Sequence, residues 1–203
     1  VNATSNLLLQ IGGSEKFRIA SDGDVIIGGS SDAGYANYAD NLTIHGTGNE
    51  GITIRSGTTS QGAIYFSDAT GTGTGTYEGS VIYDHNENNL RFATNHSERL
   101  RIDSTGRLLL NTTTAGESSA DDLTIANSGH AGMTIRSGTS SWGSFFFSDG
   151  TSGGAQYDGA IEYKHNDNYM RFRTAQTERL RIASTGAFGL AGANYGTSGQ
   201  VLT

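Results

Sequence analysis

The sequence contains no cysteine and no proline. The lack of cysteine excludes disulfide bridges and thiolate metal sites as sources of stability, and the lack of proline excludes collagen-like and polyproline structures. No apolar run approaches the roughly 18 residues of a membrane-spanning helix, so we expect no insertion into a membrane. The formal net charge of −7 argues against a nucleic-acid partner, because phosphate binding requires clustered lysine and arginine.

Glycine, in contrast, is abundant. The chain has 30 glycines among its 203 residues, which is about twice the average usage of roughly 7%. Serine, threonine, asparagine and glycine fill the spaces between apolar clusters, and this composition is typical of many short strands joined by turns. No apolar pattern with the 3.6-residue period of a helix persists along the chain. The sequence therefore predicts an all-β protein.

The chain repeats itself. Glu78–Leu110 returns almost intact as Asp158–Leu190, and Asn6–Ile27 is a shorter echo of Asn89–Leu110. A fixed long period indicates a repeat architecture, and because Val1 falls within a repeat we expect the chain to be a fragment of a longer protein. The predicted parts are the end of a truncated repeat (1–29), a linker (30–38), a first full repeat (39–114), a linker (115–119), a second full repeat (120–194) and a lead-in to a distal region (195–203).

The two full repeats differ on one face of each expected strand and agree on the other. Val81 and Tyr83 stay apolar or aromatic in the second repeat, whereas Ile82 between them is replaced by Glu162. Because side chains alternate along a strand, position 82 is expected to face water in the second repeat, and the sheets are expected to be antiparallel and packed on one side. The predicted core of the repeat and of a trimer is Ile52, Ile54, Phe66, Val81, Tyr83, Leu90, Phe92, Leu100, Ile102, Phe147, Phe172, Leu180 and Ile182.

A single repeat of this kind provides few inward apolar side chains for the backbone that it must order. Stacking repeats end to end buries more apolar surface, and joining several copies around an axis buries more still. We therefore expect an elongated, repeat-containing fibre of short antiparallel strands, in the form of a homotrimeric β-prism or β-helix-like shaft.

A family resemblance supports this expectation. The segment Ser97–Thr114, SERLRIDSTGRLLLNTTT, resembles the repeats of bacteriophage tail-fibre proteins, notably those of marine and cyanobacterial myophages. Thr177–Gly186 and Glu15–Gly23 are weaker versions of it, and the closing segment Asn194–Thr203, NYGTSGQVLT, resembles the stretch that leads into the distal end of such fibres.

The resemblance implies a homotrimeric, β-rich shaft that links a virion to a host cell, with receptor contact beyond Thr203. The expected partners are further copies of the chain and, through the parent fibre, host surface glycans or proteins. Similar repeats occur in tail-fibre-like surface adhesins of bacteria, so a bacterial extracellular or cell-surface fibre is the alternative to the virion. A carbohydrate-binding or polysaccharide-cleaving module of a tail spike is the alternative function.

The turn Asp84–Asn89 begins like a calcium loop. Such a loop requires glycine at its sixth position and a bidentate glutamate at its twelfth, where this chain has Asn89 and Asn95, and Lys164 replaces the leading aspartate in the second repeat. Asparagine tolerates the left-handed backbone of tight turns. We therefore predict a hairpin turn without a metal ion.

None of the five histidines forms a metal-binding pair such as H-x-H. His85 and His165 recur at equivalent positions, where a three-fold axis would bring three copies together. Their place in a turn favours an exposed polar role, so we expect no cofactor.

No motif predicts an enzyme. Glycoside hydrolysis requires paired carboxylates a few ångströms apart, whereas Asp68, Asp149, Glu78 and Asp158 recur at strand ends and are expected to cap turns. Two aromatic side chains of the second repeat are the candidate surface contacts for carbohydrate, Trp142 and Tyr169.

A glutamate precedes an arginine by three residues in each copy, as in Glu98 and Arg101. Ion pairs between strands or between chains are plausible here, and exposed pairs of this kind typically contribute 0–1 kcal/mol. We interpret them as controls of strand register. The equivalent pairs are Glu15 with Arg18 and Glu178 with Arg181.

Overall fold

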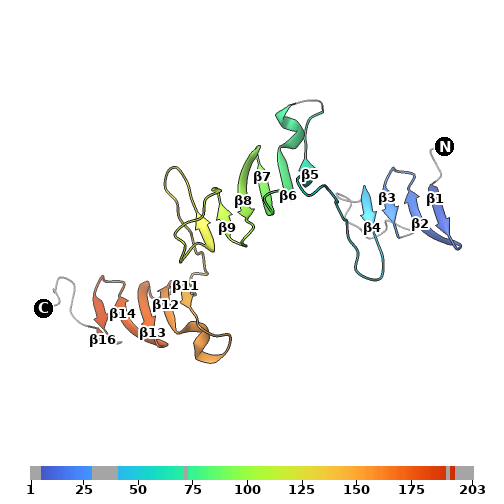
Figure 1. Ribbon diagram of the computed structural model, residues 1–203. Coiled ribbons are helices and arrows are strands. Elements are labelled where there is room, and N and C mark those ends of the chain that lie inside the picture. The colour runs from blue at the N-terminus through green and yellow to red at the C-terminus, as the bar shows by residue number, and fades with distance from the viewer. Residues whose placement is uncertain (1–5, 29–40, 71–72, 191–192, 195–203) are drawn as a thin grey trace. The chain divides into compact units, whose positions relative to one another are not determined.

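The computed structural model describes residues 6–28, 41–70, 73–190 and 193–194, and these residues form three β-sheets with no α-helix among them (Figure 1). The all-β prediction is confirmed. The chain divides into two units, Val1–Asn127 and Ser128–Thr203, and each is described by itself. The predicted linker 30–38 and the lead-in 195–203 lie outside the described residues.

The first unit contains a four-stranded sheet and a six-stranded sheet, called here the first and second sheets. Both follow chain order from one edge to the other. The first sheet consists of β1 (Leu7–Ile11), β2 (Ser14–Ile19), β3 (Val25–Ile27) and β4 (Leu42–Ile44). The second sheet consists of β5 (Gln61–Phe66), β6 (Gly79–Asp84), β7 (Asn89–Thr94), β8 (Ser97–Ile102), β9 (Leu108–Leu110) and β10 (Leu123–Ile125), with the 3-10 turn η1 (Thr74–Tyr77) between β5 and β6.

The second unit contains one six-stranded sheet, called here the third sheet. All its paired strands are antiparallel, and five of them repeat the order and lengths of β5–β9. The sheet consists of β11 (Trp142–Phe147), β12 (Gly159–Lys164), β13 (Tyr169–Thr174), β14 (Thr177–Ile182), β15 (Phe188–Leu190) and β16 (Ala193–Asn194), with the 3-10 turn η2 (Gly153–Tyr157) after β11.

Two strand pairs depart from the expected antiparallel arrangement. β3 pairs with β4, and β9 pairs with β10, in parallel. The connection from β9 to β10 crosses one face of the second sheet, where the Gly116 N–H donates to Thr124 Oγ1 at 2.9 Å. Parallel neighbours require such a crossover, which is usually a helix. The sequence has no helical pattern between these strands, so it did not indicate the parallel pairing.

The closing strand of the second sheet comes from the next repeat in the sequence. β10 (Leu123–Ile125) lies in the predicted second repeat, 120–194, yet Leu123 pairs with Leu108 of the first repeat. β4 stands in the same relation to β3. Each of these two sheets therefore ends with a strand that the following repeat supplies.

Cross-strand register places the repeated apolar side chains on one face, called here the apolar face. Val81 lies opposite Phe92, and Phe92 lies opposite Leu100. In the third sheet, Phe145 lies opposite Ile161, and Ile161 lies opposite Phe172. This arrangement agrees with the alternation deduced from the two repeats.

The opposite face, called here the polar face, carries ion pairs and also the few apolar side chains that the chain buries. Among the described residues the fully buried apolar side chains are Ile26, Leu109 and Ala160, and the register places all three on the polar face. The folded chain therefore buries little behind its apolar face.

Glu162 corrects one expectation. It lies on the polar face, as predicted, but it is only 4% exposed and does not face water. Its Oε2 accepts a hydrogen bond from Arg171 Nε at 2.8 Å and lies 3.6 Å from Arg173 Nη1. A buried carboxylate requires such paired cations, and only the structure shows that two arginines of the neighbouring strand provide them.

A β-bulge explains the recurring glutamate and arginine. The pairing of β7 with β8 shifts between Phe92 and Ala93, so Arg99 is an extra residue in β8. The shift puts Glu98 and Arg101 on the same face, where Arg101 Nε donates to Glu98 Oε1 at 2.7 Å. The pairs lie within one strand, and Arg18 and Arg181 form the same pair with Glu15 and Glu178.

The tight turns after β7 and β13 require left-handed backbone at two consecutive residues. Asn95 has φ 48°, and Ala175 in the second repeat has φ 47°. The first sheet has Gly12 and Gly13 in this turn. The left-handed conformation is sterically unfavourable for alanine, whereas glycine adopts it freely and asparagine tolerates it.

Replacing Ala175 with glycine is expected to raise the free energy of unfolding by about 1 kcal/mol. Urea denaturation of the two proteins measures this difference. Ala155→Gly is the control, because Ala155 lies in η2 without a positive φ and its replacement is expected to be destabilising. A loss of stability in both variants would contradict the strain assigned to Ala175.

Candidate functional site

The apolar faces of the sheets are the largest candidate surface. In the second sheet Phe66 is 60% exposed and Tyr83 is 40% exposed, although both belong to the predicted core. Apolar surface of this extent on one face of a sheet marks an interaction site.

The predicted core residues therefore share a face but are not buried by their own chain. The register adds apolar residues that the prediction did not include. Leu108 and Leu110, for example, lie opposite Ile102 and Leu100. The additional residues of the apolar faces are Leu7, Leu9, Phe17, Ile19, Val25, Ile27, Leu42, Ile44, Ile64, Leu108, Leu110, Leu123, Ile125, Phe145, Ile161, Tyr163, Met170, Phe188 and Leu190.

Each full repeat has a hollow at the same place on its apolar face. In the second sheet the hollow is about 300 Å³ and lies between Ile54 and the side chains of Val81 and Leu90. In the third sheet it is about 240 Å³ and lies between Ile135 and Phe145. Hollows of this kind accept apolar side chains of a packing partner.

His85 and His165 lie beside these hollows and are half-buried. The His85 ring meets the Tyr83 ring edge-on with centroids 4.9 Å apart, and His165 meets Tyr163 in the same way at 5.0 Å. The expectation of an exposed turn role is therefore wrong, because an aromatic edge contact holds each ring against the apolar face.

The turn that resembled a calcium loop is a hairpin, as predicted. Asp84 Oδ1 accepts from the backbone N–H groups of Asn86 and Glu87, and its Oδ2 accepts from Gln61 and Arg91. The hydrogen bond from Gln61 is the main cause that lowers the pKa of Asp84. Both oxygens are thus bonded within the sheet, and no cluster of three possible metal ligands occurs among the residues that the structure describes.

Trp142 and Tyr169, the predicted carbohydrate contacts, lie together. Their ring centroids are 5.5 Å apart in an edge-on contact. Arg171 Cζ lies 3.9 Å and Lys164 Nζ 4.9 Å from the Trp142 ring centroid, and Arg181 Cζ lies 4.1 Å from that of Tyr169. These cations occupy positions where a sugar would stack.

Two of the four recurring carboxylates, those of Glu78 and Asp158, contact side chains of a turn. Glu78 Oε1 lies 3.3 Å from His96 Nε2, and Asp158 Oδ1 accepts a hydrogen bond from Gln176 Nε2 at 2.9 Å. The other two, Asp68 and Asp149, each follow a strand and donate their backbone N–H to a carbonyl in the next turn.

Asp103 anchors the crossing between β9 and β10. Its carboxylate accepts from Thr105 and Arg107, and Arg107 Nη1 donates to Asp121 Oδ2 at 2.7 Å. Burial raises the pKa of Asp103, but the hydrogen bonds from Thr105 and Arg107 outweigh it and hold the pKa well below the ordinary value of 3.8. The second repeat has Ala183 and Ala187 at the equivalent positions.

Asp103→Ala is expected to lower the thermal midpoint at pH 7. Because the folded-state pKa lies below the unfolded value, the contribution of Asp103 is complete above about pH 4 and is lost progressively as the pH falls below it. The midpoints of parent and variant should therefore converge towards pH 2.5. Ala183→Ser is the control in the second repeat, and its difference from the parent should not change with pH. A gap for Asp103→Ala that is equal at both pH values would refute this role.

Two comparisons with known sequences found no relative of this chain. No described helix is long and apolar enough to cross a membrane. The chain matches no known sequence family, and no curated protein matches it.

Proposed function

We propose that this chain is a non-enzymatic structural module of a trimeric tail-fibre shaft, whose copies pack through their apolar faces. The observation that supports it most directly is the same bare apolar face in all three sheets. A single-layer sheet needs a second layer to bury such a face, and further copies of the chain have a matching surface.

The repeats support a shaft. A strand from the following repeat closes the first and second sheets through β4 and β10, so successive repeats are joined by backbone hydrogen bonds as well as by the chain. Repeat proteins are stabilised by such contacts between neighbours. The resemblance of Ser97–Thr114 to tail-fibre repeats supports three chains and a place on a virion, with a bacterial surface fibre as the alternative.

The polar face supports an outward position in the assembly. It carries charged pairs such as Arg91 Nη2 with Asp84 Oδ2 at 3.1 Å, and burying these pairs against another chain would cost solvation energy. In this proposal the shaft holds the distal part of the parent fibre away from the particle, and that distal part adheres to the host.

Light scattering coupled to size-exclusion chromatography tests the assembly. The expected mass is about three times the chain mass of 21.3 kDa, because three apolar faces can enclose a common core. A monomer at micromolar concentration would refute the proposal.

Phe145 and Phe146 provide a matched test of which face assembles. They are neighbours in β11 with similar exposure, 46% and 54%, and alternation puts Phe145 on the apolar face and Phe146 on the polar face. Phe145→Asp is expected to shift the population to monomer, because a buried carboxylate without a partner costs several kcal/mol. Phe146→Asp should leave the trimer intact. Dissociation of the Phe146→Asp variant alone would reverse the assignment of faces.

A further inference from the structure

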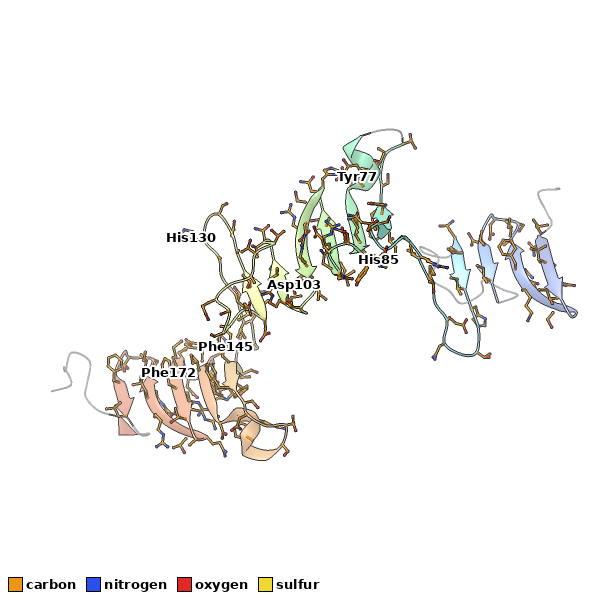
Figure 2. The ribbon with its side chains drawn as sticks, in the orientation of Figure 1. Tyr77, His85, Asp103, His130, Phe145 and Phe172 are labelled. Carbon is orange, nitrogen blue, oxygen red and sulfur yellow. The ribbon has the colours of Figure 1, made fainter. Side chains whose placement is uncertain are left out.

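The polar face of the second sheet contains a pocket of about 540 Å³ beneath η1. Two tyrosines line it: Tyr65 from β5 is 54% exposed, and Tyr77 from η1 is 45% exposed. The register places Tyr65 opposite Ser80, which confirms its place on the polar face. Figure 2 shows Tyr77 on η1, at the end of β6 far from His85. Pockets of 300–1,000 Å³ are of the size that holds small ligands.

The pocket combines these aromatic rings with hydrogen-bonding groups. Arg91 and Glu98 lie at its floor, and Arg91 Nε has no hydrogen-bond partner among the described residues although the atom is buried. His96 fixes the position of Tyr77, because the two rings meet edge-on with centroids 5.3 Å apart and His96 Nε2 lies 3.3 Å from Glu78 Oε1. The pocket is therefore built from oriented side chains.

The second repeat shows the same site in a filled form. Ala93 is replaced by Arg173, and the Arg173 guanidinium lies 5.5 Å from the ring centroid of Tyr157, the equivalent of Tyr77. Arg173 Nη2 donates to the carbonyl of Gln176 at 2.7 Å, and Nη1 lies 3.6 Å from Glu162 Oε2. A side chain of the repeat itself thus occupies the space over the tyrosine.

Other substitutions between the two repeats also distinguish the open site from the filled one. The first repeat has hydroxyl groups on Tyr65 and Ser80, whereas the second repeat has Phe146 and Ala160, which lack them. The open pocket therefore has two hydroxyl groups that the filled one lacks. If the two repeats differed only in how this site is packed, the repeat that lacks the arginine would not also need the two hydroxyl groups.

The chemistry of the lining selects the ligand. A pyranose ring has an apolar C–H face, which stacks on an aromatic ring, and a rim of hydroxyl groups that both donate and accept hydrogen bonds. The pocket has aromatic rings for the C–H face. For the hydroxyl rim it has Arg91, which also donates to Asp84, and Glu98, whose oxygens accept from Arg101 and keep further lone pairs. Because one cation and one anion face the space together, a neutral ligand is favoured over an acidic or a basic one.

We propose that the pocket of the first full repeat binds a neutral sugar, with Tyr77 and Tyr65 stacking on the ring and Arg91, Glu98 and Ser80 bonding its hydroxyl groups. The pocket lies on the face opposite the apolar face, so assembly through the apolar faces leaves it open. The site is separate from the assembly surface, and its loss and the loss of assembly are distinguishable.

Titration of the full 203-residue protein with maltotriose, cellotriose, mannotriose and chitotriose tests the proposal. Isothermal calorimetry is expected to detect one site per chain for at least one of these probes. Tyr77→Ala is expected to weaken binding by roughly tenfold or more, the loss typical of a central aromatic contact. Tyr157→Ala in the second repeat is the matched control and should bind as the parent does.

Exchanging the two repeats makes the test sharper. The double variant Ala93→Arg, Ile82→Glu transfers the filling pair into the first repeat and should abolish binding. The reverse variant Arg173→Ala, Glu162→Ile should open a second, weaker site and raise the stoichiometry from one towards two. Light scattering on each variant should show an unchanged oligomeric state.

Three results would overturn the proposal. The first is no heat of binding with any of the four sugars at ~10 mM, about ten times a millimolar dissociation constant. The second is equal weakening by Tyr77→Ala and Tyr157→Ala. The third is preferential binding of sialyllactose, an acidic probe. Failure of these titrations with an intact trimer refutes the sugar site alone, and a monomeric parent that binds sugar refutes the assembly alone.

Discussion

The need to cover one apolar face determines how this chain is built. A sheet one layer thick has two faces, and hydrophobic side chains on one of them gain stability only when another layer removes them from water. Each of the three sheets has that face, and no layer formed by the described residues of its own unit covers it: Phe66 and Phe147 remain 60% exposed. The polar faces have to make each sheet stable enough to present the apolar face in a fixed register.

The polar faces meet this requirement by local pairing. Each bulged strand pairs a glutamate with an arginine three residues later, as Glu98 does with Arg101. Leu109 is buried on this face, where the crossing segment from β9 to β10 passes over the neighbouring Thr124. In the third sheet, the buried Glu162 is held between arginines. These contacts order the strands without using the apolar side chains, which stay available for another chain.

The sequence predicted the faces well and the irregularities poorly. Comparison of the repeats was sufficient for Val81, Tyr83 and Phe92, because alternation is a local property of a strand. It could not reveal the bulge at Arg99 or the parallel pairing of Leu123 with Leu108, because both depend on contacts between strands. The pocket beneath Tyr77 was also missed. Its signal was present in the substitution of Ala93 by Arg173, but only the fold shows that this position faces a tyrosine.

The closing strands have a consequence for how such proteins change in length. β10 is encoded at the start of one repeat and completes the sheet of the repeat before it. Recombination between two copies that removes or adds one whole period therefore leaves every remaining sheet with a strand at its border. The junction needs no new sequence, because each copy begins with the same Leu-Thr-Ile segment, Leu42–Ile44 or Leu123–Ile125. A gene of this design can lengthen or shorten its product in steps of one repeat while the sheet before each repeat boundary keeps its closing parallel strand.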